Sequence, residues 1–170
     1  MTKSLVLVIP GTPVGKGRPR FSARGKYVHT YTPEKTKAYE ERIAWAWKQA
    51  HGEMIEGPVE MTITAYYRIP KSATLAQKEK MRTGDILPEK RPDIDNVVKA
   101  VMDGCQGVAF KDDAKVVRIS AAKLYSEEPG LIVDIKEVTR LGYFRRRWEQ
   151  IVNGMAGNIM ELLNMEKEET

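Results

Sequence analysis

The most regular hydrophobic pattern in the chain lies in residues 94–105. Its apolar side chains stand at positions 0, 3, 4, 7, 8 and 11 of this stretch, namely Ile94, Val97, Val98, Val101, Met102 and Cys105. This spacing puts them on one face of a helix and predicts an amphipathic helix facing a core. We expect it to pack through Ile94, Val97, Val101 and Met102.

Other stretches alternate or carry helix signals. Residues 4–9, 59–69, 115–126 and 131–138 predict strands, and EEPG (127–130) predicts a hairpin turn between the last two. Thr32 as N-cap and Pro33 as first helical residue predict a helix to about Ala50. A short helix is expected within SATLAQKEKMR (72–82), and another helix from about Tyr143 to Met165. Residues 10–33 predict a long loop or loose hairpin.

The resulting order, β, α, β, α, β, β, α, predicts an α/β fold: one domain with a mixed β-sheet packed by helices. We place residues 1–140 in this domain and regard residues 141–170 as its C-terminal helical extension. The chain has 170 residues, enough for one sizeable core. We find no apolar run of the ~20 residues that a membrane helix needs and no convincing signal sequence, so we expect a cytoplasmic protein without a membrane partner.

The predicted helix at 94–105 begins between acids. Asp93 and Asp95 flank its start, and Lys99 and Asp103 lie on its polar side. Acids in the first turn are also favoured by the helix dipole, so a purely structural role is one interpretation. If Asp93 is still extended, however, the two carboxylates can converge on one cation.

FKDDAK follows the helix closely and leads into a strand. In isolation this is an ordinary turn. An antiparallel return would bring Asp113 beside the helix start, where three carboxylates would surround one or two divalent ions. Such a site suits metal-dependent phosphodiester hydrolysis.

Other ligand sites are excluded by spacing. DIDNVVKAVMDG has Val98 and Gly104 where a calcium loop needs Gly and Glu. GTPVGKGR lacks the spacing and the Ser/Thr of a phosphate-binding loop. One cysteine and two histidines without zinc-like spacing leave carboxylates as the expected metal ligands, which favours Mg²⁺ or Mn²⁺.

Positive charge is concentrated near the N-terminus. The net charge is +5, and KGRPRFSARGK (16–26) holds five Lys/Arg and no acid. Lys16, Arg18 and Arg20 on a glycine-containing loop suit a sugar-phosphate backbone, and nearby aromatics could stack on unpaired bases: Phe21, Tyr27, His29 and Tyr31. A solvated loop, with its aromatics folded onto the core, is the alternative. Arg145–Arg147 form a second basic cluster.

Together these motifs resemble the RusA family of Holliday-junction resolvases. The resemblance is carried by RPDIDNVVKAVMDG, FKDDAKVV and LYSEEPGLIVDI and covers about residues 4–138. GKGRPRF followed by YTPEKT is similar to the variant found in Gram-positive phages and prophages.

The resemblance implies a homodimeric α/β nuclease that resolves four-way DNA junctions by paired, symmetrical nicks in recombination and repair. It implies dependence on Mg²⁺, with Mn²⁺ able to substitute. By position, the family's essential aspartates fall on Asp93, Asp95 and Asp113 as metal ligands, and its catalytic lysine falls on Lys99. Asn96 lies beside the first pair as a candidate DNA contact. Of the Asp112–Asp113 pair we choose Asp113.

Three other functions remain open at this point. The chain could be a structure-selective DNA-binding protein without catalysis, with structural acids. It could be a nuclease for another branched substrate or for RNA. It could also be an interaction protein whose acidic helix and basic loop mediate self-assembly.

Overall fold

The computed structural model describes residues 3–18, 20–24 and 27–138, with side chains for 3–18 and 32–138. Four strands form a mixed sheet in the order β1-β6-β4-β5: β1 (Ser4–Pro10), β4 (Val59–Arg68), β5 (Val116–Ser126) and β6 (Gly130–Glu137). β6 is antiparallel to both of its neighbours, whereas β4 and β5 are parallel. The α/β class with a mixed sheet is confirmed.

One expected connection is wrong. Residues 127–130 do not close a hairpin, because β6 pairs with β1 and β4 rather than with β5. The reason lies in burial: Leu131, Val133 and Ile135 of β6 are completely buried. An apolar strand of this kind gains more from a central position than from pairing with its neighbour in sequence at the sheet edge.

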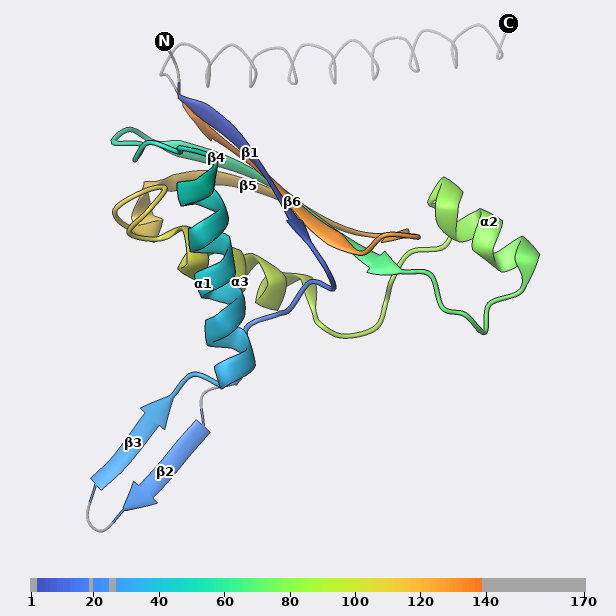
Figure 1. The fold of residues 1–170 in the computed structure, drawn as a ribbon, viewed down its shortest axis with the longest axis horizontal. Coiled ribbons are helices and arrows are strands. Elements are labelled where there is room, and N and C mark those ends of the chain that lie inside the picture. Colours follow the sequence, from blue (N-terminus) through green and yellow to red (C-terminus); the bar gives the residue numbers. More distant parts are fainter. Residues whose placement is uncertain (1–2, 19, 25–26, 139–170) are drawn as a thin grey trace, which may run out of the picture. The chain divides into compact units, whose positions relative to one another are not determined.

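Helices α1 (Glu34–Gln49) and α3 (Ile94–Cys105) pack against each other and cover one face of the sheet (Figure 1). α1 buries Thr36, Tyr39, Ile43 and Trp47, which are three or four residues apart. Its N-cap is Pro33 with no side-chain capping bond, so Thr32 is not the N-cap and the helix begins one residue later than expected.

α3 confirms the amphipathic helix but shifts its buried face. Its buried residues are Val97, Ala100, Val101, Gly104 and Cys105. Ile94 is 37% exposed, so it does not anchor the helix start. Gly104 allows close contact with α1, since a Cβ there would lie 2.8 Å from the Ile43 Cβ and 2.9 Å from the Glu40 carbonyl oxygen.

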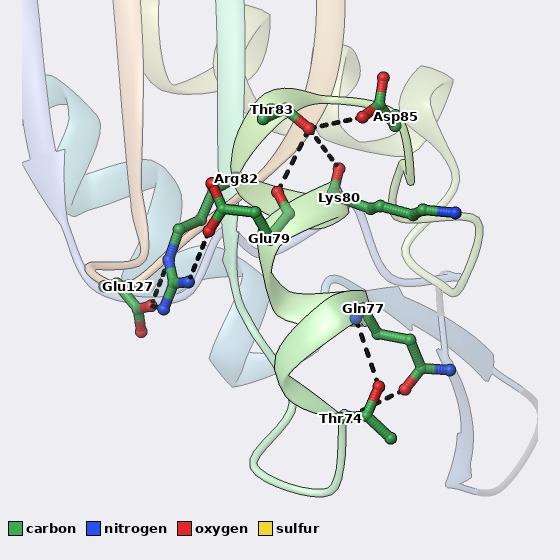
Figure 2. Close-up of polar contacts among 8 residues, drawn as sticks. All are labelled: Thr74, Gln77, Glu79, Lys80, Arg82, Thr83, Asp85 and Glu127. Carbon is green, nitrogen blue, oxygen red and sulfur yellow. Dashed lines mark hydrogen bonds and ion pairs between the residues drawn. The ribbon is translucent and has the colours of Figure 1, made fainter.

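The predicted short helix is α2 (Leu75–Thr83), which buries none of its residues. Thr74 and Gln77 form a capping box at its start, and Arg82 binds Glu127 after β5 at 2.6 Å (Figure 2). These polar contacts tie the crossover between β4 and α3 to the end of β5. Because α2 has no buried face, polar contacts rather than a core hold it.

Residues 10–33 contain a two-stranded hairpin, β2 (Arg20–Arg24) with β3 (Tyr27–Tyr31), as one of the two expectations for this stretch had it. The basic cluster Arg145–Arg147 and the expected helix at 143–165 lie outside the described residues. None of the described helices is long and apolar enough to cross a membrane.

Candidate active site at the start of α3

Asp93 is the N-cap of α3, with φ −67° and ψ 150°. Its carbonyl oxygen accepts the backbone N–H groups of Asn96 and Val97. Its carboxylate accepts no capping hydrogen bond. The extended backbone meets the condition for this side chain to converge with that of Asp95, and no capping hydrogen bond occupies its carboxylate.

Asp95 in the first turn of α3 is paired with Lys99, whose Nζ lies 3.1 Å from Asp95 Oδ2. The two side chains are 59% and 60% exposed, respectively. The hydrogen bond from Lys99 is the main cause that lowers the pKa of Asp95. The helix start therefore presents two exposed carboxylates, with a cation one turn away from Asp95.

The basic N-terminal segment is built onto this helix start. The Lys16 N–H donates to the Asn96 carbonyl oxygen at 2.7 Å. A Cβ at Gly15 would lie 2.7 Å from the Pro92 Cβ and 3.2 Å from the Asn96 Cβ, so only glycine allows this approach. The segment thus runs directly past the residues that flank Asp93 and Asp95.

Lys16 is partly buried between two acids. Its Nζ donates to Glu40 Oε1 of α1 at 2.9 Å and to Asp103 Oδ2 of α3. Burial opposes its charge, but the hydrogen bonds to Asp103 and Glu40 outweigh that effect and raise the pKa of Lys16. The side chain that sequence suggested for a DNA contact therefore joins two helices, while Arg18 is exposed and the Arg20 side chain lies outside the described residues.

Lys123 of β5 is a residue at the helix start that the motifs did not point to. Its Nζ donates to the carbonyl oxygens of Lys90 at 2.9 Å and Pro92 at 3.2 Å. The alternation of the strand could have pointed to Lys123, because residues two apart on a strand share a face and Lys123 therefore lies on the same face as Ile119 and Ala121. Lys123 fixes the end of β5 beside the acidic helix start.

Asp112 and Asp113 lie at the opposite end of β5. Asp112 caps the short 3₁₀ turn Asp113–Lys115, with its Oδ1 2.8 Å from the Ala114 N. This hydrogen bond, followed by an interaction with Asp113, lowers the pKa of Asp112. Because Asp112 is used as a cap, Asp113 is the better candidate for a functional role.

The expected return of the chain beside the start of α3 exists, but it brings Lys123 there instead of Asp113. The segment before Asp113 is held at the other end of α3, where the Ile55 N–H donates to the Ala109 carbonyl at 2.8 Å. The 12 residues of α3 separate these ends by about 18 Å. Accordingly, no group of three or more His, Cys, Asp or Glu in the described part of one chain is placed to share a metal ion.

Comparisons with known proteins agree with the motifs. Residues 10–136 match the model of the family described as endodeoxyribonuclease RusA. An uncharacterized protein of Bacillus subtilis strain 168, YqaN, is 41% identical over 132 residues, which cover 76% of this chain and 93% of that protein. The resemblance seen in the motifs is confirmed, and the chain belongs to the RusA family of endodeoxyribonucleases.

Proposed function

We propose that this chain is a divalent-metal-dependent endonuclease that resolves four-way DNA junctions by paired, symmetrical nicks, in recombination and repair. The observation that carries the proposal is the start of α3. In a chain of the RusA family, two accessible aspartates stand there beside a lysine and a basic segment. Carboxylates, a cation and a phosphate-binding segment are the groups that phosphodiester hydrolysis requires.

The aspartates Asp93, Asp95 and Asp113 are the proposed ligands of Mg²⁺, or of Mn²⁺ in its place. Their carboxylate oxygens are the donors that these cations prefer, and Asp93 has no capping bond to compete. A bound metal supplies an activated water and charge stabilisation at the scissile phosphate. Asp93 and Asp95 account for two ligands at the helix start.

Lys99 is proposed to stabilise negative charge that develops on the phosphate, or to orient the attacking water. It is held one turn from Asp95 and is exposed, so a substrate can reach it. An ammonium group that is already in place before the reaction needs little rearrangement to stabilise charge during it. Lys99 is therefore assigned a catalytic role beside the proposed ligands.

The DNA backbone is proposed to lie along the basic segment. Arg18 and Arg20 are the cations assigned to phosphates, and Asn96 is a further candidate contact beside the acid pair. Lys16 is assigned to the same surface mainly as a positioning residue, because its ammonium group is shared by Glu40 and Asp103. This arrangement would place a phosphate group of the backbone near the acids at the start of α3.

A second candidate function is junction binding without catalysis. The favouring observation is that the described part of one chain contains no three-ligand metal group. A binding protein would engage junctions equally with and without Mg²⁺ and would leave their strands intact. The acids would then have no chemical task, and Asp95→Asn would change nothing but surface charge.

The test is cleavage of a synthetic four-way junction with Mg²⁺ or with EDTA, beside a linear duplex. Asp95→Asn is compared with Asp85→Asn, which removes an exposed carboxylate after α2. We expect metal-dependent paired nicks from wild type and Asp85→Asn, none from Asp95→Asn, and junction binding by all three. Cleavage by Asp95→Asn would contradict the assignment of the site, and binding without cleavage by wild type would favour the second candidate.

A further inference from the structure

The sheet has one covered face and one open face among the described residues. Helices α1 and α3 lie on the face that carries Leu7 and Ile9, which are both 2% exposed (Figure 1). Val6 and Val8 alternate with them on β1, so they point to the other face, where they are 54% and 67% exposed. In the described ranges, none of the side chains that β1, β4 and β6 direct to this second face is buried.

A row of apolar and methyl-bearing side chains crosses the open face. The residues that pair to form it, in the order of the strands, are Val8, Ile132, Thr64 and Ala122. Tyr66 of β4 and Leu124 of β5 form the next pair on the same face, and both are partly exposed. Apolar surface that runs across a whole sheet gains free energy when a further layer removes it from water.

Asp134 of β6 gives this face an acceptor that lacks a donor. It pairs with Val6 across the strands and therefore points to the open face. Its Oδ2 atom binds Lys136, but its Oδ1 atom is shielded from solvent and accepts no hydrogen bond from the described residues. A shielded carboxylate oxygen without a donor is costly. The element that covers this face is therefore expected to bring apolar side chains and at least one N–H donor.

The sequence after β6 carries a pattern that suits the open face. Apolar side chains recur three or four residues apart, namely Phe144, Trp148, Ile151, Met155, Ile159 and Leu162. This spacing places them in a single stripe along a helix, while polar residues such as Gln150 and Asn153 fall on its other sides. Donors stand near the beginning of the stripe: the indole N–H of Trp148 and the guanidinium groups of Arg145–Arg147.

We propose that residues 143–165 form a helix that packs, through the stripe that begins at Phe144, on the open face of the sheet of its own chain. The stripe covers the row that begins at Val8, and a donor near its beginning reaches Asp134. The parallel strands β4 and β5 are then covered on both faces, as is usual for parallel strands. This inference goes beyond the proposed nuclease function and does not depend on it.

The attachment point and the length of the segment favour it as the occupant. β6 ends at Glu137, at one end of the open face, and residues 138–143 allow the chain to turn onto that face. As a helix, the stripe from Phe144 to Leu162 is about 27 Å long. The 8 residues of β6 span about 26 Å. A helix that returns along β6 therefore covers the face from end to end, and covalent attachment gives it a local concentration that a free partner lacks.

Covalent footprinting of the full chain tests whether the face is covered. Hydroxyl radicals label accessible side chains, and the measurement is the extent of labelling at Val6 and Val8. Ile151→Asp puts a charge into the stripe, and the matched control Asn153→Asp puts the same charge on the other side of the helix. We expect labelling of both valines to rise several-fold in Ile151→Asp and to stay at the wild-type level in Asn153→Asp. Equal labelling in all three proteins would overturn the proposal.

A spin label identifies the occupant without disturbing the stripe. Ser4→Cys carries the label on the open face of β1, and Glu41→Cys carries it on the exposed side of α1, beyond the opposite face. Cys105 is buried and so stays unlabelled. We expect the label at position 4 to broaden the amide NMR signals of the first half of residues 144–162 in its own chain, and the label at position 41 to leave them sharp.

Three results of the spin-label measurement would overturn the proposal. The first is the absence of broadening from position 4, which would mean that the segment does not pack on this face. The second is equal broadening from both positions, which would mean that it has no fixed place. The third is broadening that occurs only between a spin-labelled chain and an isotope-labelled second chain, because the occupant would then be the segment of another copy.

Discussion

Lys99 Nζ lies 3.1 Å from Asp95 Oδ2, one turn along α3, and both side chains are accessible to solvent. An exposed pair of this spacing contributes little to the stability of a helix, because solvent screens its charges. The pair therefore does little for folding. Its position beside Asp93 at the helix start instead favours a role in catalysis.

Replacing Lys99 should separate these two roles. We expect Lys99→Ala to change the melting temperature only slightly and to reduce junction cleavage about 100-fold, a loss typical of removing one preorganised charge from an active site. The measurement is single-turnover cleavage beside thermal unfolding. Glu41 pairs with Lys37 on α1 in the same spacing, so Lys37→Ala is the matched control and should retain activity. Equal loss in both variants would contradict a catalytic role for Lys99.

The same substitution should change how Asp95 titrates. Its pKa is lowered in the folded chain, so the pair with Lys99 stabilises the fold above the carboxyl group's unfolded pKa, and this contribution disappears as the pH falls through the folded value. In Lys99→Ala the pKa of Asp95 should rise toward its ordinary value of about 4. Carboxyl-carbon NMR titration of the metal-free protein measures this directly, and an unchanged pKa would show that Lys99 is not the cause.

Lys16 should act on stability more than on DNA affinity. Its side chain is 27% exposed and the Glu40 side chain 17%, so Lys16→Ala leaves a poorly solvated carboxylate without its cation. We expect a loss of about 1–2 kcal/mol in the free energy of unfolding. Urea denaturation measures this loss, and Lys16→Met, which keeps the length of the side chain, should lose a similar amount. A variant as stable as wild type would mean that the ion pairs contribute nothing.

Arg18 should behave in the opposite way. Because it is exposed, Arg18→Ala should leave stability unchanged while weakening junction binding. The slope of log affinity against log salt should fall by about one, as for the loss of one phosphate contact. Lys48, exposed in the last turn of α1, provides a control cation that should not alter the slope. Identical slopes for Arg18→Ala and wild type would remove Arg18 from the DNA surface.

The periodicity and the motifs predicted the local elements well, because α3 and the strands follow from residues that alternate or repeat at helical spacing. The family was also readable, since the acid, lysine and glycine positions are local patterns. Pairing between distant strands could not be predicted. The alternating residues of LIVDIKEV indicate a strand, but they do not indicate that it pairs with β1 and β4 instead of with β5. The position of Asp113 was mispredicted for the same reason. It depends on the direction of β5, which runs parallel to β4 and so begins at the far end of α3 from Asp93.

Gly15 offers the most direct test of the link between the basic segment and the acidic helix start. A Cβ at this position would lie 2.7 Å from the Pro92 Cβ, and neither atom can move without moving the backbone. Gly15→Ala should therefore cost about 1–3 kcal/mol of unfolding free energy, as overpacking does, and should displace the segment from Asn96. Gly130→Ala is the control, since its nearest contact would be an ordinary 3.4 Å.

If the segment positions the DNA backbone over Asp93 and Asp95, Gly15→Ala should reduce cleavage by more than it reduces junction affinity, because a bound but displaced phosphate is out of reach of the acids. Equal reductions would show that the segment supplies affinity alone.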